Sequence, residues 1–218
     1  MENAIFIKER KGRFLCEVKI GQRQELCYVS NSSNMSKLLD LKNRPVLLKP
    51  NKGYNLRTNY TLYATYYEGS YFLLDLNDLN NVFAQYMTEQ LSKNIQVRKE
   101  FKINDYKSDY YIPSQNRIVE IKGILSASSQ AQYTFKNHKR AFLQLKEIKN
   151  LLQRGYNVNY VFIMLNPNID TFHLQDKRLK ENRLFLECIK LGMQVNFYKT
   201  ELKQDKFKIY KNHVQTNF

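Results

Sequence analysis

The chain of 218 residues has no tryptophan and only 7 glycines, 4 prolines, 3 cysteines and 3 histidines. Cys16, Cys27 and Cys188 form no CxxC motif and no Cys/His cluster. We therefore expect reduced thiols in the core and neither a disulfide framework nor a zinc site. The sequence also lacks a Gly-rich phosphate loop and a nucleophile–base arrangement, which leaves a small-molecule metabolic enzyme without support.

Long apolar runs are also absent. The longest strongly apolar stretch is Tyr160 to Leu165, which is far too short to span a bilayer. Met1 to Ala4 lead directly into charged residues from Lys8 to Lys11, so we expect no ordinary signal peptide. These features predict a cytoplasmic protein with no membrane partner.

Acidic residues are scarce relative to basic ones. Lys plus Arg number 35 against 20 Asp plus Glu, a formal net charge of +15, and the excess occurs in both the first third and the remainder of the chain. A positively charged folded surface favours a polyanionic partner, and we expect that partner to be DNA. An AT-rich coding bias is the alternative, but it would raise Glu as well and so does not explain the imbalance.

The composition, 43% hydrophobic and 25% charged, is that of a globular protein. We expect two domains, residues 1–77 and residues 78–218. In the first, a series of short strands with one inserted helix predicts a small OB-like β-barrel. The expected strands are 13–20, 25–30, 45–49, 59–67 and 70–76, and the expected helix is 35–40. Aromatics from Tyr60 to Phe72 could stack on bases, although barrel core is the commoner role for such residues.

The second domain reads as a mixed sheet flanked by helices. Apolar residues at helical spacing predict helices at about 79–92, 136–154 and 177–191, the second ending at Gly155. Strands are expected at 95–103, 156–165 and 194–200 around a central hairpin. The final segment, from Lys203 to Phe218, reads as an edge strand or a mobile tail.

The hairpin carries the residues that suggest chemistry. Ser108 to Pro113 and Arg117 to Gly123 both read as strands. Glu120 and Lys122 are two residues apart and share one strand face, and Asp109 can lie beside Glu120 if the strands pair. Two carboxylates and an ammonium suit Mg²⁺- or Mn²⁺-assisted phosphodiester hydrolysis. The pattern resembles the PD-(D/E)xK nuclease signature; an exposed, solvated charge face is the alternative.

Further matches extend over nearly the full chain. Together these residues resemble the sugar fermentation stimulation protein family, SfsA. They are Arg13-Phe14-Leu15, Asn31, Met35, Arg57, Tyr60-Thr61-Leu62, Asp109-Tyr110, Val119-Glu120-Ile121-Lys122, Arg140, Leu145, Glu147, Leu151 and Gly155. The resemblance implies an OB-like N-terminal domain, a PD-(D/E)xK restriction-endonuclease-like second domain, and binding to DNA. We expect nucleic-acid contacts from Arg13, Asn31, Arg57, Lys139 and Arg140.

The sequence also departs from the family pattern. The family's Phe-Pro-Asp-Ala segment is here Tyr133 to Lys136, with no acid, and its Gly-Arg pair is Ser33-Asn34. Nucleases of this class often carry a further Glu on the first helix of the domain. The nearest match here is Gln85, with Glu89 one turn later as a substitute.

Two hypotheses of different classes follow. The first is a Mg²⁺- or Mn²⁺-dependent deoxyribonuclease in which Asp109 and Glu120 hold the metal and Lys122 positions the attacking water. The second is a non-catalytic DNA-binding regulator, of the kind that governs sugar metabolism, that has kept a nuclease fold. The choice of single- or double-stranded DNA and the oligomeric state, a homodimer among the options, cannot be read from the residues.

Overall fold

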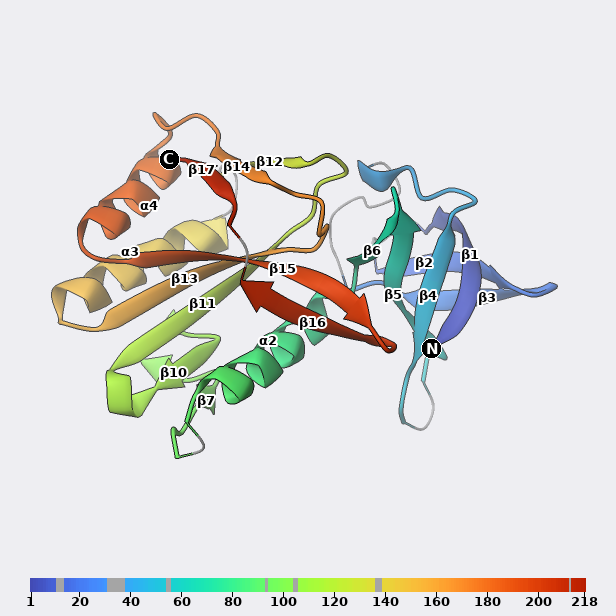
Figure 1. The fold of residues 1–218 in the computed structure, drawn as a ribbon, viewed down its shortest axis with the longest axis horizontal. Helices are drawn as coiled ribbons and strands as arrows, with labels where there is room; N and C mark the ends of the chain where they lie inside the picture. Colours follow the sequence, from blue (N-terminus) through green and yellow to red (C-terminus); the bar gives the residue numbers. More distant parts are fainter. Residues whose placement is uncertain are drawn as a thin grey trace.

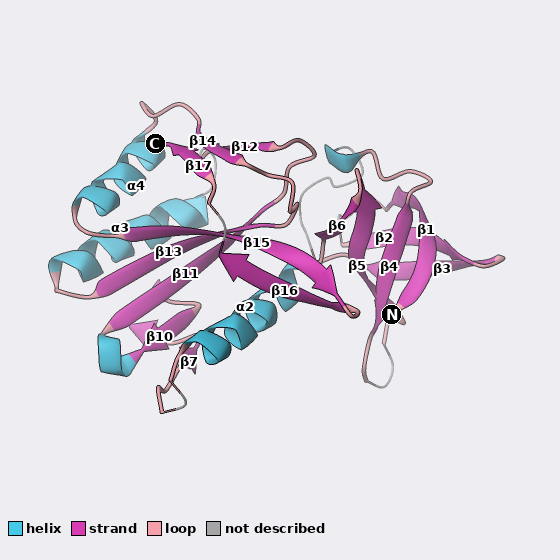
Figure 2. Cartoon of the chain, in the orientation of Figure 1, coloured by secondary structure: helices cyan, strands magenta, loops and turns pink. Residues whose placement is uncertain are grey.

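The first third of the chain folds into a closed barrel, and the remainder forms a mixed sheet with helices on both faces (Figures 1 and 2). The computed structural model describes residues 1–10, 14–30, 38–53, 56–92, 94–103, 106–135, 139–211 and 213–218. Within them, no helix combines the length and apolarity needed to cross a bilayer.

Five strands close the barrel. They are β1 (Glu2–Glu9), β2 (Leu15–Ile20), β3 (Arg23–Tyr28), β4 (Pro45–Pro50) and β5 (Tyr60–Tyr67). Parallel pairing of β3 with β5, at Cys27 opposite Tyr60, joins the two ends of the sheet, which removes open strand edges. A sixth strand, β6 (Ser70–Leu73), extends from β5. The predicted OB-like barrel is confirmed.

Apolar side chains of different sizes fill the barrel interior. The buried set includes Phe6, Cys16, Val18, Cys27, Leu48, Leu62 and Phe72. Gly21 lies in the turn between β2 and β3 with φ +56°, a conformation that glycine adopts without steric cost. Of the aromatic run, Tyr63 is core whereas Tyr66 is exposed, with its ring packed edge-on against Tyr71.

Three elements of the barrel differ from the sequence prediction or lie outside the residues that the structure describes. The strand β1 was not predicted, although Ala4 and Phe6 alternate inward along it. The strand expected at 70–76 ends at Leu73, because Asp75 caps the following helix by accepting a hydrogen bond from the backbone N–H of Asn77. Most of the helix expected at 35–40 lies outside the described residues.

The mixed sheet has three parallel central strands, β11 (Arg117–Ile124), β13 (Asn157–Met164) and β15 (Gln194–Lys203). Antiparallel strands flank them: β10 (Tyr110–Ile112) and β7 (Arg98–Lys99) on one side, β16 (Lys206–Lys211) on the other. The segment after Lys203 therefore begins with an edge strand. Two smaller sheets complete the domain: β8 (Lys102–Ile103) with β9 (Tyr106–Lys107), and β12 (Gln130–Tyr133), β14 (Thr171–Leu174) and β17 (Gln215–Asn217). The second of these, and the division of 95–103 between two sheets, were not predicted.

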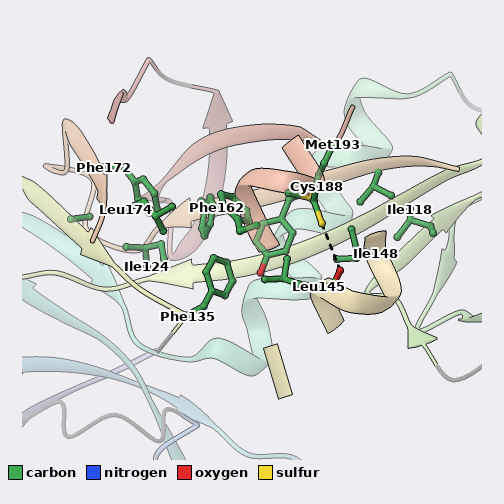
Figure 3. Close-up of a cluster of buried hydrophobic side chains, with 14 of the residues drawn as sticks. Ile118, Ile124, Phe135, Leu145, Ile148, Phe162, Phe172, Leu174, Cys188 and Met193 are labelled. Carbon is green, nitrogen blue, oxygen red and sulfur yellow. Dashed lines mark hydrogen bonds between the residues drawn. The ribbon is translucent and has the colours of Figure 1, made fainter. Parts of the chain in front are cut away.

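Three helices cover the sheet. On one face lies α2 (Leu76–Gln90), whose Leu79, Val82 and Phe83 pack with Val119 and Ile121 of β11. On the other lie α3 (Lys139–Gln153) and α4 (Lys180–Lys190). Figure 3 shows the core beneath them, where the thiol of Cys188 donates a 3.6 Å hydrogen bond to the carbonyl of Leu145. The central strands β11 and β13 therefore have one face toward α2 and the other toward α3 and α4.

Candidate functional site

Strands β10 and β11 pair as an antiparallel hairpin at the centre of the candidate site. Tyr110 lies opposite Val119 and Ile112 opposite Arg117. A single 3₁₀ turn, Pro113–Gln115, connects them, and Asn116 follows in the left-handed conformation that Asn tolerates better than most residues. This register places Asp109, the residue that precedes β10, opposite Glu120.

Glu120 is almost completely enclosed, with 1% of its surface exposed. Its Oε2 accepts a 2.6 Å hydrogen bond from the hydroxyl of Tyr106, and its Oε1 accepts a 2.7 Å hydrogen bond from the ammonium of Lys122. The same ammonium donates at 3.2 Å to Oε1 of Gln144 on α3. A buried charge requires such partners, because an unpaired carboxylate in the interior is very costly.

Asp109 bridges the hairpin and α2. Its Oδ2 accepts a 2.7 Å hydrogen bond from the backbone N–H of Ile121, and the side chain of Asn80 donates to the same carboxylate. Burial and the negative charge of Glu120 raise the pKa of Asp109 to about 6, against the opposing effects of Ile121, Lys122 and Asn80. The register of β10 on β11 sets the two carboxylates side by side, so the charge of Glu120 disfavours the ionised form of Asp109.

Phenol rings surround Glu120. Burial raises the pKa of Tyr106, Tyr133 and Tyr160 above the ordinary value, and the charge of Glu120 adds to each shift. Tyr106 lies on β9, Tyr133 on β12 and Tyr160 on β13. The carboxylate thus has one phenol bonded to it, that of Tyr106, and Lys122 as its cationic partner.

The two residues of the expected helix position lie away from the two carboxylates. Gln85 and Glu89 are exposed, and the amide of Gln85 donates a 3.2 Å hydrogen bond to Glu89. At 100° per residue, Gln85 lies about 140° and Glu89 about 180° around the helix from Asn80. Since Asn80 is the residue of α2 that reaches Asp109, the other two point elsewhere.

Of the five residues expected to contact nucleic acid, three lie in the part of the chain that the structure describes. Arg13 and Asn31 lie outside the described residues. Arg57 is exposed in the connection between β4 and β5, and Lys139 and Arg140 are exposed in the first turn of α3. Arg140 is four residues before Gln144 and so shares its helix face. Because Gln144 contacts Lys122, this face places Arg140 toward the candidate site.

Sequence reasoning missed Tyr106, Asn80 and Gln144. Each belongs to a different element, β9, α2 and α3, and none lies in a motif with Asp109 or Glu120. No local signal in the sequence identifies them, because their contacts depend on how the three elements pack around the hairpin.

The residues present fit a hard divalent cation. Asp109 and Glu120 supply carboxylate oxygens, and within the described part of the chain no three His, Cys, Asp or Glu side chains gather to hold a metal. An ion here would complete its shell with water and substrate oxygens. Mg²⁺ takes one or two protein carboxylates in this way, whereas structural zinc needs four ligands.

Comparisons with known proteins agree with this architecture. A family model described as "SfsA N-terminal OB domain" matches residues 9–74, and one described as "Sugar fermentation stimulation protein RE domain" matches residues 77–206. A sugar fermentation stimulation protein homolog of Natranaerobius thermophilus is 27% identical over 168 residues, covering 72% of this chain and 70% of that protein. The homolog of Desulfitobacterium hafniense is 23% identical over 204 residues, covering 90% and 88%.

A solved structure shows the same fold. Pyrococcus furiosus SfsA in complex with Ca²⁺ superposes with a TM-score of 0.80 at 20% sequence identity, covering 100% of this chain and 96% of that one. The matched family models together span the barrel and most of the mixed-sheet domain. The chain therefore belongs to the SfsA family of sugar fermentation stimulation proteins.

Proposed function

We propose that this protein binds DNA and hydrolyses its phosphodiester bonds at a metal-dependent site formed by Asp109, Glu120 and Lys122. The observation that carries the proposal is the 1%-exposed carboxylate of Glu120 held beside a second carboxylate. Two like charges sharing a buried site cost folding free energy, and such arrangements are common at functional sites.

A divalent cation, Mg²⁺ or Mn²⁺, would remove that cost. Asp109 and Glu120 would hold the ion, which supplies Lewis-acid polarisation of a phosphoryl oxygen and a coordinated water of lowered pKa. A cation at the same position neutralises the repulsion that raises the pKa of Asp109. The Pyrococcus furiosus protein was solved in complex with Ca²⁺, which supports a divalent ion for this fold.

Lys122 and Arg140 would act on the substrate, and Gln144 would act through Lys122. The ammonium of Lys122 is placed to orient the attacking water or to stabilise the charge of the transition state. Gln144 fixes that ammonium from α3. Arg140, on the same helix face, is placed to contact a backbone phosphate, as Arg does by bidentate hydrogen bonding. The net charge of +15 supports a polyanionic partner.

The test is cleavage of labelled single-stranded, duplex and flapped DNA with Mg²⁺, with Mn²⁺ and with chelator. We expect metal-dependent products from the wild type and none from Glu120→Ala or Lys122→Ala, while both variants still bind DNA. Lys190→Ala, an exposed change at the end of α4, serves as the matched control. Cleavage that persists in both purified variants would remove the assignment.

A second function, a DNA-binding regulator without turnover, is favoured by two specific observations. Lys122 is bonded to Glu120, and the helix residue beside Asp109 is an asparagine, not a carboxylate. This alternative predicts DNA affinity that falls steeply with salt and no products with either metal. Loss of salt-dependent DNA binding would contradict both functions.

A further inference from the structure

The two oxygens of Glu120 have different surroundings. Oε2 accepts from the hydroxyl of Tyr106 at 2.6 Å, and Tyr106 is itself only 3% exposed. Oε1 accepts from Lys122 at 2.7 Å, and the Lys122 side chain is 24% exposed. The carboxylate therefore has an enclosed oxygen and a more open one.

Tyr106 is held in place by contacts outside the site. It belongs to the small β8–β9 sheet, next to Lys107, whose ammonium pairs with Glu100 at 2.9 Å. Phe101, on the other side of this segment, stacks on Tyr111 of β10 with ring centroids 4.7 Å apart. The ring stacking anchors the segment to the main sheet, and the hydroxyl of Tyr106 is directed at Glu120 without a ligand.

We propose that Tyr106 is a positioning residue that leaves Glu120 a single oxygen, Oε1, for a divalent cation, and that Lys122 occupies this oxygen in the metal-free protein. This inference rests on the proposed metal site. The hydroxyl fixes the rotation of the carboxylate, as hydrogen-bonded partners of metal ligands generally do. The ammonium is a cation already bound where the metal would bind.

Metal binding then requires a defined movement of Lys122. Its bond to Oε1 must break, whereas its second bond, to Gln144, can remain. The lysine would stay attached to α3 and turn toward the substrate side. Tyr106 and Lys122 consequently have opposite effects on metal affinity: one prepares Glu120 for the ion, and the other competes with it.

Isothermal titration of the purified protein with Mn²⁺, without DNA, tests both effects. Tyr106→Phe removes one hydroxyl and should weaken Mn²⁺ binding by about 10- to 100-fold, the usual cost of losing such a partner. Lys122→Met should bind Mn²⁺ more tightly, by several-fold, while losing cleavage. Tyr111→Phe is the matched control: it removes a hydroxyl that donates to Asn116 at 3.2 Å, and its Mn²⁺ affinity should equal that of the wild type.

The outcomes separate this inference from the proposed function. If the wild type binds Mn²⁺ and Tyr106→Phe binds it equally well, the positioning role is wrong and the metal site stands. If Lys122→Met binds no more tightly than the wild type, the competition is wrong. If the wild type binds no Mn²⁺, the proposed site fails and this inference fails with it. Should Tyr106→Phe prove unfolded by circular dichroism, a crystal structure of the wild type with Mn²⁺ decides the positioning role: an ion bound to Oε2 in place of the Tyr106 hydroxyl would overturn it, and an ion on Oε1 with that hydroxyl still bonded to Oε2 would support it.

Discussion

The barrel and the mixed-sheet domain each bury a glutamate, and the two are held in different ways. Glu17 of β2 is 9% exposed and pairs with Arg10 and, at 3.6 Å, with Lys8, two cations whose side chains are 58% and 62% exposed. Glu120 of β11 is 1% exposed and is bound by an enclosed phenol and a partly buried ammonium. One carboxylate is neutralised at the surface and the other inside the protein.

The difference separates a structural ion pair from a candidate site. The two cations that pair with Glu17 are more than half exposed, so water screens these pairs. Glu120 also experiences a second carboxylate, Asp109, whose pKa it raises. Paired carboxylates that repel each other in a buried position are characteristic of functional sites.

The largest expected contrast between the two glutamates is metal-linked stability. A ligand at 100 times its dissociation constant stabilises the folded state by about 2.7 kcal/mol. We expect that gain with Mn²⁺ in the wild type and in Glu17→Gln, and none in Glu120→Gln, measured by urea unfolding. An equal gain in Glu120→Gln would place the ion elsewhere.

A smaller effect is expected from the other carboxylate of the pair. Asp109→Asn keeps a side-chain oxygen that can accept the hydrogen bond from the backbone N–H of Ile121. Because the substitution removes the repulsion with Glu120, we expect it to stabilise the metal-free protein at pH 7 by about 1–2 kcal/mol. The pKa of Asp109 is raised to about 6. The cost of ionising this carboxyl is therefore fully present above pH 6 and disappears as the pH falls toward its ordinary value of 3.8.

The gain from Asp109→Asn should accordingly shrink between pH 7 and pH 4. Thermal melts of both proteins across this range measure it. A variant that is less stable than the wild type at pH 7 would show that the bond from Ile121 outweighs the repulsion, and that Asp109 serves the fold.

The smallest effects are expected on the surface of α3. Lys139→Ala and Arg140→Ala should each weaken DNA binding by about 3- to 10-fold and reduce the salt slope by about one. Arg140→Ala should cost more, because Arg140 shares a helix face with Gln144. Lys190→Ala on α4 provides the control with the same charge change, and fluorescence anisotropy at several salt concentrations is the measurement. Equal losses in all three variants would mean that only net charge matters.

Much of the architecture could be predicted from periodicity. The expected strands 13–20 and 25–30 correspond to β2 and β3, and apolar residues at helical spacing over 136–154 predicted α3. The strand β1 was missed because its charged end, Lys8 to Arg10, outweighed the alternation of Ala4 and Phe6. The sheet of β12, β14 and β17 was missed because its strands are short and polar and pair across about forty residues.

The candidate site could be predicted only where it is local. Period-two spacing placed Glu120 and Lys122 on one face, and hairpin pairing placed Asp109 beside them. Asn80 could not be predicted, because α2 reaches the hairpin only through packing of segments far apart in sequence. Tyr106 is only three residues before Asp109, but it belongs to the separate β8–β9 sheet, so strand alternation along the hairpin does not place it. The family pattern directed attention to Gln85, whose position on α2 faces solvent.

The central claim is that Asp109 and Glu120 hold a divalent cation. The most direct measurement is a crystal structure of the protein with Mn²⁺, in which anomalous scattering locates the ion. The account predicts a peak within about 2.0–2.3 Å of a carboxylate oxygen of Asp109 and of Glu120 Oε1, with Tyr106 still bonded to Oε2 and Lys122 displaced. The claim would be contradicted if, in crystals saturated with Mn²⁺, no peak lay between the two carboxylates and Lys122 remained bonded to Oε1.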